Sequence, residues 1–345
     1  MKKQAAQNQH YVPKFILRNF LHDERREQVN VFNKRSLHGF TTSIKNIMAE
    51  RRFHEFRIEE EFIASFEESI CRIEDVLLPV YRRVIETRRL SNDPEEKALL
   101  AMLIAFQMLR TRSHRDQFLR IEQQLTEHVE RLGLSMANFE GGYEPHDEDS
   151  LKRTHIQFMR ESMEQFTQII AQKDFLLLNA AEGRSFYLAD NPVALHNDEP
   201  KDSIFGNIGL AVRGIQIHLP LSSDLMLCAW CPSILEGIRR SRADQERALS
   251  SIILSPRMMG AIRSRAELDR NLAEMRKARE RMRGWLQHFE DGTPMPSNSD
   301  NMDFYNTMQV GYAREFIVCR RGDFSLAKRY VQETGSGGRG IEIVS

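Results

Sequence analysis

The chain has 345 residues, of which 41% are hydrophobic and 28% are charged, a balance that excludes disordered and fibrous proteins and suffices for one or two sizeable cores. Its 49 basic and 49 acidic residues give a formal net charge of zero. The overall charge therefore neither predicts nor excludes binding to nucleic acid, which would need the charges to segregate onto separate faces.

The residues after Met1 are polar, and the longest apolar run, residues 98–106, is about half as long as a membrane span. Four cysteines are too few for a disulfide scaffold in a chain of this length. We therefore expect a cytoplasmic protein without a membrane segment. Cys228 and Cys231 have the spacing of a redox motif or half of a zinc site, but they lie in an apolar run without a second pair, which favours a buried strand.

The first half of the chain is predicted to be mainly helical. Pro13 is placed to open a short helix, and residues 29–32 alternate like a strand. Apolar residues at steps of three and four predict a helix over 59–89. A capping sequence before Pro94 predicts a second long helix over 94–129, and we expect the two long helices to pack antiparallel.

The character of the sequence changes after residues 138–149, which are typical of an exposed linker. A third helix is predicted over 150–172. Strands 174–179 and 185–188 are expected to pair around a turn, and two further strands are predicted at 214–219 and 224–230.

Residues 233–289 form a charged helical stretch with narrow apolar stripes and flanks that carry both signs of charge. This pattern favours a protruding hairpin or a subunit contact that makes a homodimer, with nucleic-acid binding as the less favoured alternative. A last helix at 302–309 and a strand at 315–319 follow, and the Gly-rich tail, 336–345, is expected to be flexible.

Together these elements predict an α+β fold. A mostly antiparallel sheet, built largely from the second half, is expected to pack against the long helical hairpin of the first half. Residues 1–137 would hold the N-terminal motif and the hairpin, and 150–335 the α+β portion with the additional charged helical segment as an insertion. We expect these parts to form one integrated domain.

Several short motifs occur along the chain, at residues 9–13, 17–20, 67–74, 107, 110–111, 190–193 and 220–222. In this order they resemble those of a widespread bacterial family listed as a domain of unknown function, which is recognised by an N-terminal His-Tyr-Val-Pro and a central Ser-Asp-Asn-Pro motif. The resemblance covers most of residues 9–320 and implies a fold and a set of site positions. Here Ala189 replaces the usual Ser, which removes a nucleophilic hydroxyl, and the 233–289 segment is more elaborate.

Polar residues on the two long helices form one candidate cluster. Glu67 and Glu74 share a helical face about 10 Å apart, and Gln107, Arg110 and His114 form a polar stripe on the next predicted helix. The cluster is either an Arg–Glu bridge that holds the helices together or a catalytic or phosphate-binding site. Arg110 is the best single candidate because its guanidinium binds a carboxylate or a phosphate bidentately.

A second group lies at predicted strand ends and in the N-terminal motif. Asp190 and Asn191 either form a turn that ties a loop together or point catalytic groups off a strand end. The loop carrying Ser222 is expected beside them. His10 either caps backbone groups or faces a pocket.

We expect these residues to gather into one site from distant segments. His10, Glu74 and Asp190 are assigned catalytic roles, and Glu74 and Asp190 would also bind Mg²⁺ or Mn²⁺. The predicted substrate-binding residues are Arg18, Gln107, Arg110, Asn191 and Ser222.

The sequence contains no phosphate-binding loop, dinucleotide fingerprint, nucleophile elbow or zinc-protease motif. The remaining polar residues suit a metal-dependent hydrolase of phosphate esters, such as a nuclease-like effector in antiviral defence against phage, with nucleic acid or a nucleotide as the partner. A noncatalytic module that binds a ligand or a protein is the alternative. A third possibility is an assembly component that uses the charged helices.

Overall fold

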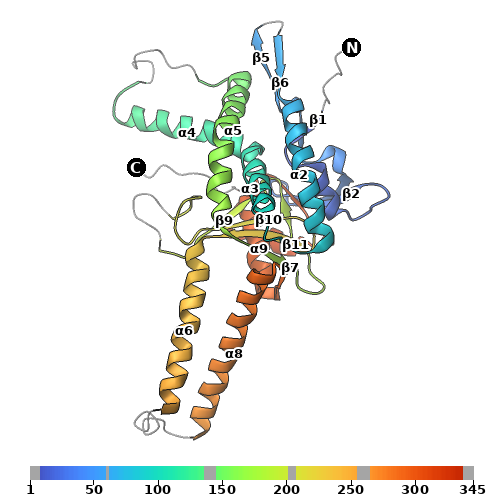
Figure 1. Ribbon diagram of the computed structural model, residues 1–345. Helices are drawn as coiled ribbons and strands as arrows, with labels where there is room; N and C mark the ends of the chain where they lie inside the picture. The colour runs from blue at the N-terminus through green and yellow to red at the C-terminus, as the bar shows by residue number, and fades with distance from the viewer. Residues whose placement is uncertain (1–7, 60–61, 136–144, 201–206, 255–264, 337–345) are drawn as a thin grey trace.

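The computed structural model describes residues 8–59, 62–135, 145–200, 207–254 and 265–336. It has the predicted α+β fold, in which mostly antiparallel sheets are covered by long helices (Figure 1). Part of the expected linker and nearly all of the expected flexible tail lie outside the described residues. Within the described residues, no helix combines the length and the apolar character needed to cross a bilayer.

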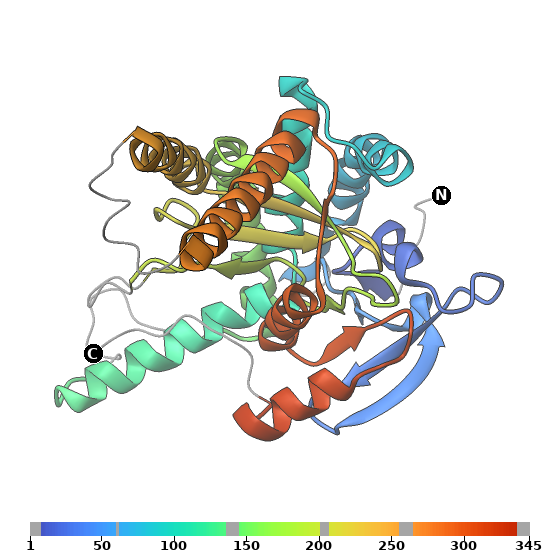
Figure 2. The ribbon, with the colours of Figure 1, turned by 90° about the horizontal axis from the view of Figure 1, so that it is seen from below.

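A five-stranded sheet lies at the centre of the molecule (Figure 2). Its order is β12-β7-β11-β10-β9, and every pairing is antiparallel except that of β12 with β7. The predicted strands 174–179, 214–219 and 224–230 are confirmed as three adjacent members of this sheet. The strands are β7 (Asp174–Asn179), β9 (Ala194–His196), β10 (Gln216–Pro220), β11 (Leu225–Trp230) and β12 (Met295–Pro296).

A four-stranded sheet, β3-β2-β13-β8, joins strands from both ends of the chain. The predicted pairing of 185–188 with 174–179 is wrong, because β8 pairs with β13. The side chain of Asn306 donates to the carbonyl of Ser185 and accepts from the backbone N–H of Tyr187, so these backbone groups bond to a helix and not to β7. The strands are β2 (Gln28–Asn33), β3 (His38–Ser43), β8 (Leu188–Ala189) and β13 (Phe316–Val318).

The predicted helix over 59–89 begins later than expected, at Glu67. Residues 55–59 and 62–65 form two antiparallel strands instead, and the side chain of Ser65 accepts from the backbone N–H of Glu67 where the helix starts. The short helix after Pro13 is confirmed. The elements are β1 (Asn8–His10), α1 (Lys14–Leu17), the 3-10 helices η1 (Arg18–Phe20) and η2 (Ile44–Asn46), β4 (Ala49–Arg51), β5 (Glu55–Glu59), β6 (Phe62–Ser65) and α2 (Glu67–Thr87).

The predicted helix over 94–129 is two helices, α3 (Pro94–Leu109) and α4 (Arg112–Arg131). Arg110 leaves helical geometry with φ −86° and ψ 0°, and Thr111 caps α4 by accepting from the backbone N–H of His114. α3 packs against α2 and against α5 (Glu148–Ala171). The break turns α4 away from the helical hairpin and redirects every side chain after Arg110.

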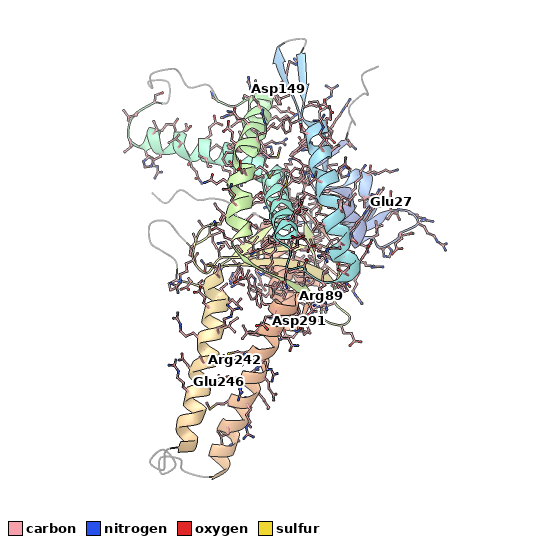
Figure 3. The ribbon with its side chains drawn as sticks, in the orientation of Figure 1. Glu27, Arg89, Asp149, Arg242, Glu246 and Asp291 are labelled. Atoms are coloured by element: carbon pink, nitrogen blue, oxygen red, sulfur yellow. The ribbon has the colours of Figure 1, made fainter. Side chains whose placement is uncertain are left out.

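The charged stretch forms two long helices, α6 (Pro232–Leu254) and α8 (Arg265–Asp291), which project side by side from the body (Figures 1 and 2). Their lower parts carry mixed charges, with Arg242 and Glu246 paired along α6 (Figure 3). The last helices are α9 (Ser299–Tyr312) and α10 (Ser325–Thr334).

The central sheet is apolar on both faces, which explains the continuous apolar runs of its strands. Leu177 and Leu227 on one face join a core that includes α3. Leu176 and Cys228 on the other face pack with methionines of α9. Cys228 and Cys231 are both buried and free, so the predicted buried strand is confirmed at Cys228.

Candidate functional site

Arg110 connects the helical hairpin to the N-terminal motif. Its side chain is only 1% exposed, and its Nη1 donates to Glu74 Oε1 at 2.5 Å. Its Nη2 donates to the carbonyl oxygen of His10, also at 2.5 Å, while the guanidinium lies 4.5 Å from the ring centre of Phe106. The Arg–Glu bridge considered from the sequence is therefore present, and the same side chain also holds the motif.

His10 and Gln107 contact backbone groups of the same region. The imidazole of His10 is buried and donates through Nε2 to the carbonyl of Ile44 at 2.8 Å. Burial lowers the pKa of His10 below its ordinary value. Gln107 donates to the carbonyl of Tyr11 at 3.1 Å. Together with Arg110, these contacts fix the His-Tyr-Val-Pro segment against α3.

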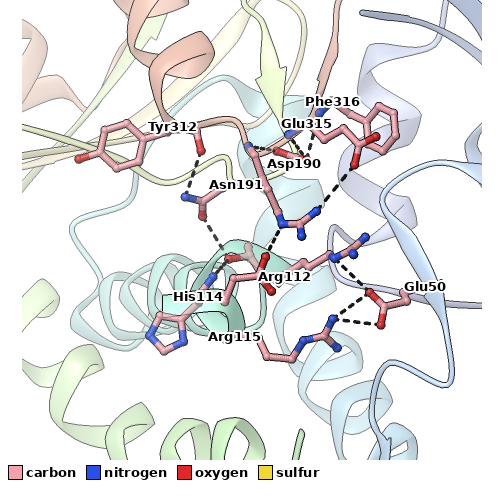
Figure 4. Close-up of polar contacts among 12 residues, drawn as sticks. Glu50, Arg112, His114, Arg115, Asp190, Asn191, Tyr312, Glu315 and Phe316 are labelled. Atoms are coloured by element: carbon pink, nitrogen blue, oxygen red, sulfur yellow. Dashed lines mark hydrogen bonds and ion pairs between the residues drawn. The ribbon is translucent and has the colours of Figure 1, made fainter. Parts of the chain in front are cut away.

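Asp190 is 3% exposed and lies where β8 ends. Its Oδ1 accepts from the backbone N–H of Arg314 at 2.7 Å, and its Oδ2 accepts from those of Glu315 and Phe316 at 2.9 and 3.0 Å (Figure 4). Burial raises the pKa of Asp190 to about 6, although these N–H groups and the nearby Arg314 side chain act in the opposite direction. The carboxyl group thus organises the loop that enters β13.

Asn191 links that loop to the break between α3 and α4. Its Oδ1 accepts from Thr111 Oγ1 at 3.1 Å, and its amide donates to the carbonyl of Tyr312 at 3.4 Å (Figure 4). Thr111 directly follows Arg110 and Asn191 directly follows Asp190, so hydrogen bonds together with these two chain-adjacent pairs connect Glu74 and His10 with Asp190. We call this set of residues the network. The structure therefore brings together the predicted residues of both helices, the motif and the strand end.

Two predicted residues do not contact that network. Arg18 forms an exposed ion pair with Glu27 at 2.9 Å. Ser222 bonds to Asp224 at 2.6 Å in the turn between β10 and β11. The backbone N–H of Ser223 donates to the carbonyl of Asn19, so the segments that carry Arg18 and Ser222 are in contact with each other.

A pocket of about 550 Å³ opens beside the network, and we call it the arginine pocket. It lies among β4, the first turns of α4, the start of α5 and the loop before β13. Figure 4 shows Arg112 and Arg115 directed toward Glu50 at this place. Its charged lining residues are Glu50, Arg112, Arg115, Asp116, Arg120, Glu148 and Arg314.

The arginines of this pocket are only partly neutralised. Arg115 is 6% exposed, and its Nη2 donates to both oxygens of Glu50 at 3.0 Å, while its Nε and Nη1 have no hydrogen-bond partner among the described residues. Arg120 leaves Nε and Nη2 buried and without a partner within the same part of the chain. Arg314 pairs with Asp116. Buried N–H donors without acceptors are costly. These atoms are almost inaccessible to solvent, so an acceptor in the pocket would reach them only after the guanidinium groups turn toward it.

None of the charged residues that line the arginine pocket was among the site residues predicted from the sequence. Its α4 members, Arg112, Arg115, Asp116 and Arg120, follow the three-and-four spacing of one helical face, which was visible in the sequence. The expectation of one continuous helix from 94 to 129 obscured this signal. Arg314 and Glu50 reach the same pocket from distant segments, so only the fold identifies them.

The predicted metal ligands Glu74 and Asp190 are engaged with Arg110 and with backbone N–H groups respectively. Among the described residues, no three His, Cys, Asp or Glu side chains are grouped as a metal site. Binding of Mg²⁺ or Mn²⁺ remains a prediction.

The family described as "Protein of unknown function (DUF4238)" matches residues 8–323. No curated protein and no solved structure matches the chain.

Proposed function

Since the chain belongs to the DUF4238 family, whose function is unknown, we propose a function from the site alone: the protein binds a nucleotide through its phosphate groups in the arginine pocket. The observation that carries this proposal is the set of buried guanidinium N–H groups without acceptors on Arg115 and Arg120.

The charges of the arginine pocket favour a ligand that is an anion. Four arginines line it against three carboxylates, which leaves a surplus of one positive charge. Nε and Nη2 of Arg120 lie along one edge of the guanidinium, the arrangement that binds two oxygens of one phosphate. The charge of Arg115 is already paired with Glu50, so the cation left for an anion is Arg120, which makes no ion pair among the described residues.

The size and remaining lining of the pocket support a nucleotide over a bare phosphate ion. A volume of about 550 Å³ lies within the range of small-molecule sites. Leu119 and Leu151 supply apolar surface, and Gln123 supplies an amide that can donate to and accept from a base. These three side chains lie on the same two helices, α4 and α5, that frame the pocket.

Hydrolysis of a phosphate ester is the second candidate function. Glu50, Asp116 and Glu148 are carboxylates in the same pocket, where Arg115, Arg314 and Lys152 pair with them. A divalent cation bound to phosphates prefers such oxygen ligands and would replace one of these partners. We propose that, with Mg²⁺ or Mn²⁺ from the solution, the protein hydrolyses phosphate esters in this pocket. This would be its activity as a nuclease-like effector in phage defence.

Calorimetric titration of the full chain with ATP, GTP and a short single-stranded oligonucleotide tests the proposal. Arg120→Met should weaken nucleotide binding at least roughly tenfold, because a hydrogen bond to a charged group contributes about 1.5–3 kcal/mol. Arg115→Lys keeps the positive charge but removes the planar guanidinium, so it should weaken nucleotide binding if the guanidinium N–H groups of Arg115 contact the phosphates. Arg72→Met, which removes an exposed arginine on α2, is the matched control.

Binding of none of the three probes, or equal binding by wild type and Arg120→Met, would overturn the proposal. If only the oligonucleotide binds tightly, and Arg120→Met abolishes that binding, the ligand of the arginine pocket is nucleic acid and not a free nucleotide. Phosphate release measured in the same samples with Mg²⁺ or Mn²⁺ distinguishes hydrolysis from binding.

A further inference from the structure

Glu50 contacts two arginines of the arginine pocket (Figure 4). Both oxygens of its carboxylate accept from Nη2 of Arg115 at 3.0 Å, and its Oε2 lies 3.4 Å from Nε of Arg112. A carboxylate paired with two guanidinium groups is an anion that the chain itself supplies to the pocket. Arg112 and Arg115 therefore hold an anion in this structure, and that anion is Glu50.

The other two acids of the pocket have different partners. Asp116 pairs with Arg314, and Glu148 pairs with Lys152 one helical turn along α5. Within the described part of the chain, neither of them pairs with an arginine of α4. Glu50 is thus the acid of this pocket that occupies the arginines of α4.

The position of Glu50 allows its side chain to leave without a change in the fold. Its backbone is fixed in β4, where Glu50 lies opposite Gln9 of β1. The side chain of Glu50 is 23% exposed and that of Arg112 is 36% exposed, so this ion pair borders the solvent. Because a glutamate side chain has several rotamers, rotation about its own bonds moves the carboxylate toward the solvent.

These contacts determine what an incoming anion meets. Arg120 makes no ion pair among the described residues, whereas Arg112 and Arg115 are held by Glu50. A tethered carboxylate competes at a high effective concentration, so a small monovalent anion from solution displaces it poorly. A ligand with several phosphates that also contacts Arg120 competes better, because it gains more than one charged contact.

We propose that Glu50 is a built-in competitor for the phosphates of the ligand: a polyphosphate displaces it from Arg112 and Arg115, and small monovalent anions do not. This inference rests on the proposed nucleotide site and adds the residue that sets its selectivity among anions.

Calorimetric titration with ATP compares wild type with Glu50→Gln, which keeps the size of the side chain and removes the competing charge. Glu50→Gln should bind ATP at least roughly tenfold more tightly, because binding no longer breaks a hydrogen bond between charged groups. Glu148→Gln is the matched control, since it removes the same charge from the same pocket but frees no arginine of α4. Its effect should stay below roughly threefold, because Glu148 is exposed and its charge is screened.

A second measurement does not need the nucleotide. Glu50→Ala leaves Arg115 without its carboxylate, so a small carboxylate from solution can take that place. Sodium formate should raise the melting temperature of Glu50→Ala by about 2 °C or more relative to equimolar sodium chloride, and wild type should melt at the same temperature in both salts. The titration of Glu50→Gln stands by itself if Glu50→Ala folds poorly.

ATP binding by Glu50→Gln that is no tighter than that of wild type would overturn the inference and leave the proposed function standing. An equal gain in Glu148→Gln would overturn it too, since the effect would be one of overall charge. If neither wild type nor Glu50→Gln binds ATP, the proposed function fails and the formate measurement decides the inference. Selective stabilisation of Glu50→Ala then supports the place of Glu50 as one for an anion, and equal effects on Glu50→Ala and wild type overturn it.

Discussion

Acidification from about pH 7.5 to 5.5 should destabilise the protein through three buried histidines. Burial lowers the pKa of His114 to about 4 and the pKa values of His155 and His218 to about 3. In the unfolded chain these imidazoles would bind protons below about pH 6.5, whereas in the folded protein they stay neutral. Their stabilising effect is therefore full above pH 6.5 and is lost as the pH falls.

The magnitude follows from the difference in proton uptake. Each of the three groups should lower the free energy of unfolding by a little over 1 kcal/mol across this range, or by about 4 kcal/mol together. Asp190 acts in the opposite sense because its folded-state pKa is raised to about 6, and it should restore about 1 kcal/mol of the free energy of unfolding. The net loss of about 3 kcal/mol is a large part of the stability of an ordinary domain.

Urea denaturation at the two pH values measures this loss. His114→Phe should reduce this loss by about 1 kcal/mol, because it removes one of the three titrating imidazoles. A phenyl ring suits the position, since His114 lies among the rings of Phe118 and Phe158 and its Nδ1 has no partner among the described residues. The exposed substitution His38→Gln should keep the full loss. Equal stability at the two pH values, or an unchanged loss in His114→Phe, would refute the reasoning.

Three further predictions concern the helical break and the hairpin. Arg110→Met should lower the free energy of unfolding by about 3 kcal/mol, because it leaves Glu74 without its partner. Arg110→Lys should lose less, though still a measurable part, and thermal denaturation of both variants measures the difference. Thr111→Val removes the cap of α4 and should cost about 1–2 kcal/mol in urea, whereas Thr111→Ser should cost less. Replacing residues 240–285 by a short Gly/Ser linker should convert a homodimer to a monomer in light scattering; a monomeric wild type, or a variant that stays dimeric, would contradict the predicted subunit contact.

Local signals in the sequence predicted several elements because their causes are local. Asp93 caps α3 and Pro94 opens it, and both were readable from residue type. The apolar runs of β7 and β11 were equally readable, since both faces of the central sheet are buried. The break at Arg110 could not be predicted in the same way, because the apolar pattern of α3 does not indicate a change in chain direction. Only Thr111, a residue type that often caps helices, indicates that another helix begins there.

The errors arose where distant groups decide the structure. Residues 185–188 looked like the partner of β7, but the side chain of Asn306, about 120 residues later, takes their backbone groups. The network from Glu74 to Asp190 was predicted in part because Arg110 has an unusual place among apolar neighbours. The arginine pocket needed the position of Arg314, which no spacing along the chain gives.

Phosphorus NMR of ATP in the presence of the protein tests the central claim most directly, because it observes the phosphate groups themselves. The account predicts that wild-type protein broadens or shifts the β- and γ-phosphate resonances, and that Arg120→Met largely abolishes the change while Arg72→Met does not. Unperturbed phosphate resonances with wild type, or the same perturbation with Arg120→Met, would contradict nucleotide binding in the arginine pocket.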